Sequence, residues 1–313
     1  MQNRITLSIL ALTVVLAFSI VAFAQTELAP PGWKTCPHCL TPKQQRENDT
    51  TVNKPGLPFN PRDLSGVWNT RPDRPGVDIV ETVHDAFAKD QNSSGIPPKN
   101  LPSMTPYGRK LFDATLTDFK TPEGTRVTNS KDPMLKCDPL GWPRWFTYNY
   151  GIEFVMLPDR VLQFIEWGHT WRTIWIDGRK LPENPPEPRF LGWAVGHWEP
   201  DNTFVVESTG FDDRTWISEA GNFITKPGSK GWGLNGWPHS DEMKVVERWK
   251  RTSYGILEGQ VTVIDPKVYE KPWTTDIVKH TLLSNTEIWE YFCVPSDSEY
   301  FNEKVVRPSN GAK

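Results

Sequence analysis

Two short motifs carry the residues with the clearest potential for chemistry. Asp212-Asp213-Arg214 and His239-Ser240-Asp241 flank a connection that is rich in Gly and Trp. A histidine beside a carboxylate can act as a general base, and an arginine can stabilise an oxyanion. The same side chains could instead hold a metal ion, or cap turns and fix loops through ion pairs. The candidate catalytic residues are therefore His239, Asp241, Asp212 and Arg214.

Several ionisable residues lie on predicted strands, where they could point into the protein. Glu207, Glu247, His197 and Glu166 are the candidates. A buried carboxylate needs a partner or has a raised pKa. The possible partners are Arg172, Arg248 and Arg251. Such a pair could serve as an acid and a base facing a pocket, or as a structural ion pair.

The chain contains 15 tryptophans, which is far above an ordinary share. Indole rings fill cores and also form platforms for ligands. Trp175, Trp193, Trp249 and Trp289 fall on predicted strands and are assigned to the core. Trp142, Trp216 and Trp237 fall on loops with Gly and Pro, where an indole face can stay accessible. The candidate ligand-binding residues are Trp142, Trp216, Trp237, His197, Glu207 and Glu247.

The elements that must position these residues read as strands. Short runs with strand-like composition alternate with Pro, Asp, Asn and Gly turns, which is typical of an antiparallel meander. A long meander must close or stack to protect its edges. We therefore predict an all-β fold, a barrel of about 8–10 strands. The predicted strands are one that begins at Gly66 and the runs 152–157, 161–167, 170–176, 191–199, 203–209, 243–252, 256–265, 275–283 and 286–293. In 243–251 the odd positions form the inward face, because the even positions are mostly charged.

The domain organisation follows from the segments around this meander. Residues 1–24 are predicted to be a signal peptide, with Arg4 before an apolar run and Ala22-Phe23-Ala24 as a cleavage site; the alternative is an uncleaved anchor. Residues 25–60 are a flexible, Pro-rich arm, and 61–305 form a single domain. Long insertions occupy 70–150 and 210–240, and short helices are predicted at 79–89 and 105–119.

Four cysteines, Cys36, Cys39, Cys137 and Cys293, favour disulfides in an exported protein. We favour Cys137 with Cys293, because both lie in structured regions, and Cys36 with Cys39. Cys36-Pro37-His38-Cys39 matches the tetrapeptide of oxidising thioredoxin-fold enzymes, but no βαβ unit surrounds it, so a small structural disulfide is predicted. No second Cys or His pair completes a zinc site. We predict neither a metal nor another cofactor.

The net charge of the chain is −3, which gives no electrostatic footprint for nucleic acid. No segment after the signal is apolar enough to span a bilayer. No signal in the sequence indicates an oligomeric state.

Gly66-Val67-Trp68 resembles the first-strand motif of lipocalins and calycins. That resemblance implies a tryptophan that closes one end of a barrel beneath an arginine from a late strand. More widely, the chain resembles a family of uncharacterised secreted bacterial proteins, which implies export and a barrel but no reaction. The shared segments are 105–108, 137–144, 161–167, 174–182, 196–199, 204–213 and 238–248.

These observations predict a secreted or periplasmic β-barrel that binds a small, largely apolar or aromatic ligand inside the barrel. One alternative is an envelope enzyme, a lyase, isomerase or hydrolase, with a His/carboxylate pair at the barrel mouth. The other is a structural or partner-binding envelope protein.

Overall fold

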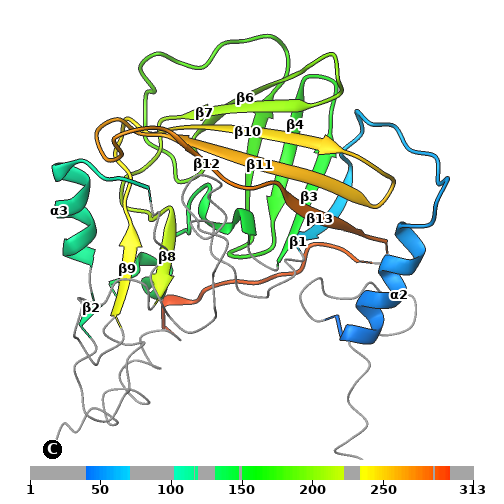
Figure 1. Cartoon of the computed structure of the whole chain (residues 1–313), viewed down its shortest axis with the longest axis horizontal. Helices are drawn as coiled ribbons and strands as arrows, with labels where there is room; N and C mark the ends of the chain where they lie inside the picture. The colour runs from blue at the N-terminus through cyan, green and yellow to red at the C-terminus, as the bar shows by residue number, and fades with distance from the viewer. Residues whose placement is uncertain are drawn as a thin grey trace, which may run out of the picture.

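The computed structural model describes residues 40–70, 102–115, 117–118, 131–147, 150–221, 233–284 and 286–296. Within this part of the chain, nine strands form a closed barrel (Figure 1). The strands are β1 (Gly66–Thr70), β3 (Gly151–Met156), β4 (Arg160–Ile165), β5 (Thr170–Trp175), β6 (Trp193–Trp198), β7 (Phe204–Thr209), β10 (Lys244–Arg251), β11 (Ile256–Ile264) and β13 (Val278–Leu283). A short β12 (Trp273–Thr274) pairs with β11 beside β13. The predicted all-β barrel is confirmed.

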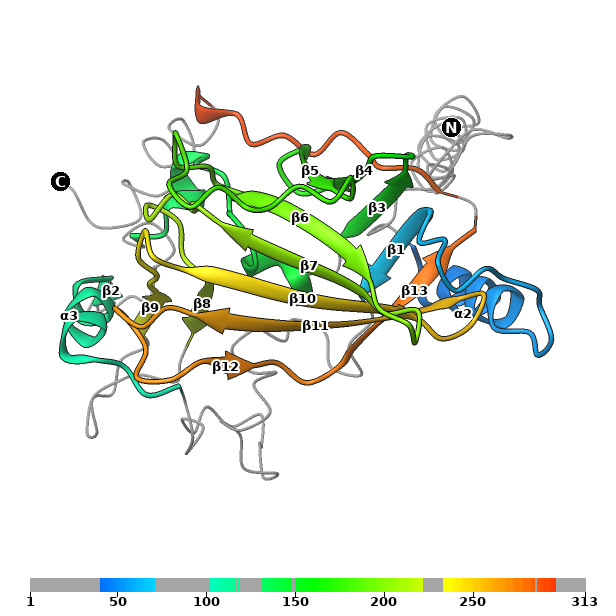
Figure 2. The ribbon, with the colours of Figure 1, turned by 90° about the horizontal axis from the view of Figure 1, so that it is seen from above.

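The strands follow one another around the barrel in chain order, and the first pairs with the last. β1 pairs with both β3 and β13. Figure 2 shows β6, β7, β10 and β11 side by side in the order of their pairings. All neighbours are antiparallel except β5 and β6. The parallel pair is a difference from the expected antiparallel meander, and it has a topological cause. Nine strands cannot alternate direction all the way around a closed ring, so one neighbouring pair must run parallel.

The strand from 286 to 293 was wrongly predicted. In the structure this segment has no ladder, and its backbone pairing with the barrel is an isolated bridge of Tyr291 with Trp167. The other predicted strands are present. Of the predicted helices, 105–119 appears as α3 (Pro106–Thr115), and 79–89 lies outside the described residues.

The barrel interior is apolar and aromatic. On β10, burial alternates as predicted, with Val245, Glu247, Trp249 and Arg251 inward. Gly259 on the neighbouring β11 leaves space for rings, because a Cβ there would lie 2.6 Å from the Trp249 indole. Tight contacts of this kind are typical of a packed core.

Part of the insertion before β3 fills this interior. The segment contains two 3-10 turns, η4 (Pro133–Lys136) and η5 (Arg144–Thr147). Phe146 packs edge-on against Trp249 and His280, with ring centroids 5.5 Å apart in each case. The Trp142 ring lies 4.2 Å from the Arg172 guanidinium carbon. We call residues 140–147 the plug. Buried Arg144 anchors it through a hydrogen bond of 2.8 Å to Asp132.

The second insertion folds into a small sheet that the sequence did not predict. β8 (Ser218–Gly221) pairs with β9 (Gly233–Trp237), and β9 pairs with β2 (Thr117–Asp118). Helix α3 covers β9, with Phe112 and Trp237 centroids 5.2 Å apart (Figure 1). Residues 106–115 and 117–118 of the first insertion and 218–221 and 233–237 of the second thus form one small unit beside the barrel.

Helix α2 (Pro42–Val52) lies in the segment predicted as a flexible arm. Thr41 and Gln44 form a capping box at its start, and Val52 is fully buried at its end. The Asn48 amide donates to the carbonyl of Leu282 on β13, at 2.9 Å. The Thr-x-x-Gln spacing was a readable helix signal, although the helix has few apolar residues to form a stripe.

Trp68 is buried where β1 enters the barrel, beneath an arginine. The guanidinium carbon of Arg251 lies 5.2 Å from the Trp68 ring. Arg251 also donates to the carbonyls of Asp63 and Tyr254, each at 2.7 Å.

Among the described residues, no helix has the length and hydropathy needed to cross a membrane.

Candidate functional site

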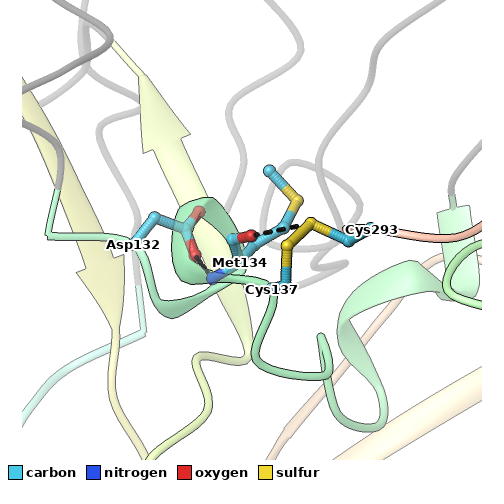
Figure 3. Close-up of a disulfide and its surroundings, with 4 residues drawn as sticks. All are labelled: Asp132, Met134, Cys137 and Cys293. Carbon is cyan, nitrogen blue, oxygen red and sulfur yellow. Dashed lines mark hydrogen bonds between the residues drawn. A yellow bond between two sulfur atoms is a disulfide. The ribbon is translucent and has the colours of Figure 1, made fainter. Parts of the chain in front are cut away.

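A disulfide joins the end of η4, just before the plug, to residues 286–296, which we call the C-terminal segment. Cys137 and Cys293 are bonded, with their Cα atoms 5.3 Å apart, which confirms the predicted pair (Figure 3). The main-chain oxygen of Met134 lies 4.0 Å from the Cys293 sulfur. Cys36 and Cys39 lie outside the described residues. The bond holds the segment after residue 286 against η4.

This disulfide forms one wall of a pocket of about 450 Å³, which we call the aromatic pocket. Its ring-bearing walls come from the plug, from the turn after β4 and from the C-terminal segment. The Trp167 and Tyr291 centroids lie 4.7 Å apart, and Tyr150 packs on Trp167 at 4.6 Å. The main lining side chains are Met134, Leu140, Trp145, Trp167, Tyr291 and Phe292.

A second pocket, of about 680 Å³, adjoins the first. We call it the crossover groove, because it lies between β5, β6 and the connection that joins them. Trp171 marks the outer face, since its side chain is 57% exposed while that of the next residue, Arg172, is buried. Pro139, Thr170 and Leu191 line both pockets. The groove side chains that matter below are Trp171, Trp175, Arg179, Lys180, Arg189 and Trp193.

Of the predicted interior carboxylates, Glu247 lies inside the barrel with a cationic partner. Arg172 donates to Glu247 at 2.6 Å and to the Gln163 side-chain oxygen at 2.7 Å. Trp249 Nε1 donates to the same Glu247 oxygen at 3.0 Å. All these side chains are buried. Glu166 is buried too, and accepts a hydrogen bond of 2.6 Å from the N–H of Gly151.

The prediction that His197 and Glu207 point inward is wrong. Both side chains are exposed on the outer face of the barrel. The inward positions of β6 and β7 are Ala194, Gly196 and Trp198, and Phe204, Val206 and Ser208. Because Val205 and Val206 are both apolar, the alternation in 203–209 did not distinguish the faces.

The structure separates most of the predicted catalytic set. His239 is buried, and Nδ1 lies 3.0 Å from the Ser240 carbonyl while Nε2 lies 2.9 Å from the Thr215 hydroxyl. Since a carbonyl oxygen only accepts, Nδ1 donates and Nε2 accepts. Burial lowers the pKa of His239. The ring is therefore neutral and both of its nitrogens have partners.

The predicted carboxylate partners bind cations instead. Asp241 is exposed and pairs with Lys267 at 2.9 Å, which lowers the pKa of this carboxyl. Asp212 pairs with Arg214 at 2.6 Å, with the same effect on its pKa. Neither carboxylate has a hydrogen bond to His239 in the described part of the chain. The side chain that orders the His239 loop is Asp265, which accepts from the Ser240 N–H at 2.6 Å. Sequence reasoning missed this residue.

The loop tryptophans are buried rather than accessible, which corrects the predicted exposure of Trp142, Trp216 and Trp237. The described parts of the two insertions fold into the plug and the small sheet, so these three indoles become core. Trp249 is in the core as predicted. Trp175 and Trp193, which were assigned to the core, are half-buried and line the crossover groove; Trp289 is half-buried in the irregular C-terminal segment.

Within the described ranges, no group of three or more His, Cys, Asp and Glu side chains lies close enough to hold a metal ion. No model of a protein family matches the sequence, and no curated protein or solved structure is recognisably similar to it.

Proposed function

We propose that the protein binds a small, largely apolar or aromatic molecule in the aromatic pocket. The observation that carries this proposal is the pocket itself, about 450 Å³ in volume and walled by Trp145, Trp167 and Tyr291. Sites for small molecules usually have volumes of roughly 300–1,000 Å³ and mainly apolar or aromatic walls. The Cys137–Cys293 disulfide holds two of the walls together before a ligand arrives, which reduces the entropy lost on binding.

The aromatic pocket replaces the barrel interior as the proposed site. Trp142 and Phe146 of the plug occupy the interior and pack on Arg172 and Trp249. A ligand inside the barrel would have to displace these rings, at a free-energy cost typical of disrupting a packed core. The aromatic pocket requires no such rearrangement.

Export to the envelope and a lipocalin-like build belong to the same proposal. The apolar run of residues 5–23 and the disulfide support export, because disulfides persist in oxidising compartments. Trp68 beneath Arg251 supports the lipocalin-like build. Mass spectrometry of the protein purified from its native host would test export, with a mature chain starting near Gln25 as the expected result.

The enzymatic alternative has less support. His239 would need a free ring nitrogen and a carboxylate at hydrogen-bond distance. Its two nitrogens bond to Thr215 and Ser240, and Asp241 pairs with Lys267. We therefore favour a binding function over an enzymatic one.

Native mass spectrometry of the purified protein tests the binding proposal, with a co-purified small molecule as the expected result. A screen of lipophilic compounds by tryptophan fluorescence extends the test, because Trp145 and Trp167 line the pocket. Tyr291→Ala should weaken binding at least tenfold. Tyr107→Ala is the matched control, since Tyr107 is 45% exposed on α3 and does not line the pocket. The proposal fails if no compound binds, or if both variants behave alike.

A further inference from the structure

The crossover groove continues the aromatic pocket but has different chemistry. Pro139, Thr170 and Leu191 border both spaces, so the groove begins where the aromatic pocket ends. The groove owes its existence to the parallel β5–β6 pair. A chain that leaves β5 must return to the other end of the barrel before β6 can begin, and residues 176–192 make this return.

Cationic side chains line the groove. Arg179, Lys180 and Arg189 contribute to its surface, and no Asp or Glu is among the described residues that line it. Arg172 also borders the groove, but its guanidinium is paired with Glu247 inside the barrel. The charged side chains of the described lining are thus all cationic, on a protein whose net charge is negative.

The counter-charges lie outside the groove. Asp177 accepts from Arg179 at 2.7 Å, and Glu187 accepts from Arg189 at 3.0 Å, but neither carboxylate lines the groove. Lys180 is exposed and makes no ion pair with the described residues. Exposed ion pairs of this kind are weak, so a carboxylate ligand can share or replace these partners.

Stacking on indoles fixes the arginines in place. The guanidinium carbon of Arg179 lies 3.6 Å from the Trp175 ring centroid, and that of Arg189 lies 3.4 Å from Trp193. The Nε and Nη2 donors of Arg179 already bind Asp177, and those of Arg189 bind Glu187. A stacked guanidinium still presents N–H donors along its other edge, where a carboxylate can bind. Because the side chains are already ordered, binding an anion there loses less side-chain entropy.

We propose that the ligand of the aromatic pocket is an amphipathic acid, whose apolar body lies in that pocket and whose anionic group binds Lys180 and Arg189 in the crossover groove. This inference rests on the proposed function and adds the chemical class of the ligand. A neutral lipophilic molecule would satisfy the pocket and leave the groove unused.

Two probes that differ only at one end separate the two proposals. The apolar parts of 6-phenylhexanoate and 6-phenylhexan-1-ol are identical, and only the first is anionic at pH 7. Isothermal titration calorimetry at low salt should give at least tenfold tighter binding for the acid. Added salt should weaken binding of the acid only, because screening acts on charge.

Charge variants locate the anionic group. Lys180→Gln combined with Arg189→Gln should reduce the affinity for the acid about tenfold and leave the affinity for the alcohol unchanged. Glu187→Gln should preserve or increase the affinity for the acid, because it removes the counter-charge of Arg189. Lys279→Gln is the control, since Lys279 is exposed on β13 and does not line the groove.

The outcomes are distinct. Equal affinities for the two probes, or an acid that binds the double variant as well as the native protein, would overturn the inference and leave the proposed function standing. If neither probe binds and no compound of the lipophilic screen changes the tryptophan fluorescence, the proposed function itself is refuted.

Discussion

Arg172 on β5 and Glu247 on β10 form an ion pair of 2.6 Å inside the barrel, although β6 and β7 separate their strands in the wall. The pair therefore links two sides of the barrel through its interior. The exposed fractions of the two side chains are 2% and 0%, so water screens this pair very little.

Glu247→Gln should destabilise the protein by about 3–5 kcal/mol, because it leaves the Arg172 charge buried without a counter-ion. Urea unfolding measures this change. Replacing both residues by Met should restore part of the lost stability, since no unpaired charge remains although Gln163 and Trp249 lose a hydrogen bond. Asp113→Asn serves as the control, because its pair with Arg109 is exposed on α3 and should contribute little. A single variant as stable as the native protein would show that the pair is not needed.

Phe146→Ala should destabilise the protein by about 3–5 kcal/mol, the usual range for deleting a buried phenylalanine ring. The ring packs on Trp249 and His280 inside the barrel, and the plug cannot easily collapse into the space left behind. Thermal unfolding followed by tryptophan fluorescence checks both stability and the Trp249 environment. Phe59→Ala, at a side chain that is 38% exposed, should have a much smaller effect. Similar losses for the two variants would contradict the assigned role of the plug.

Cys137→Ser should lower the free energy of unfolding by roughly 5 kcal/mol in the chain-entropy model, because the bond closes a long loop. The two cysteines are 156 residues apart in the sequence. The melting temperature of the variant should match that of the native protein under reducing conditions. Ligand binding should weaken as well, since the bond forms a wall of the aromatic pocket. A variant with the native melting temperature would rule out this stabilising role.

Stability should fall as the pH drops from about 6.5 to 5. Burial lowers the pKa of His280 to about 3, so in this window the unfolded chain binds a proton that the folded chain does not. The stabilisation is complete above the unfolded pKa and decreases below it, by up to about 1.4 kcal/mol per pH unit. His239 acts in the same direction, because burial also lowers its pKa.

Urea unfolding at several pH values isolates the part due to His280. His280→Gln should remove one titrating group. The slope of the unfolding free energy against pH should then fall by up to about 1.4 kcal/mol per pH unit. The paired aspartates have lowered pKa values, and they reduce stability only when the pH approaches their unfolded pKa near 4. The window above pH 5 therefore reports mainly on histidines. An unchanged slope in the variant would mean that His280 is not responsible.

Much of the barrel could be predicted from the sequence because its strands are bounded by turn residues. The alternation of charged and apolar residues in 243–251 is sufficient to place Glu247 and Trp249 inward, as on β10 of the structure. The position of Cys137 and Cys293 in structured regions was sufficient to predict the disulfide between them. In each case a local pattern was sufficient.

The site could not be predicted in the same way, because it depends on how the insertions fold. Trp142 and Trp216 lie among Gly and Pro, and nothing local indicates that the plug enters the barrel. Tyr291 lies on a segment with strand-like composition that forms no ladder, because β13 already pairs with β1 and β11. The groove depends on the parallel pair, which follows from the number of strands and not from the sequence of β5 or β6.

The pairing of Val67 with Leu283 has a consequence for how the chain reaches its native state. The barrel wall cannot be completed from either end alone, because β1 has no second neighbour until β13 has been synthesised. A nascent chain that ends before β13 would carry two open edges, one on β1 and one on the last strand made, and an open edge can pair with a foreign strand. The last stage of folding must therefore bring together two distant parts of the polypeptide, which is intrinsically slow. Until the two strands meet, both edges of the wall stay open to pairing with other chains.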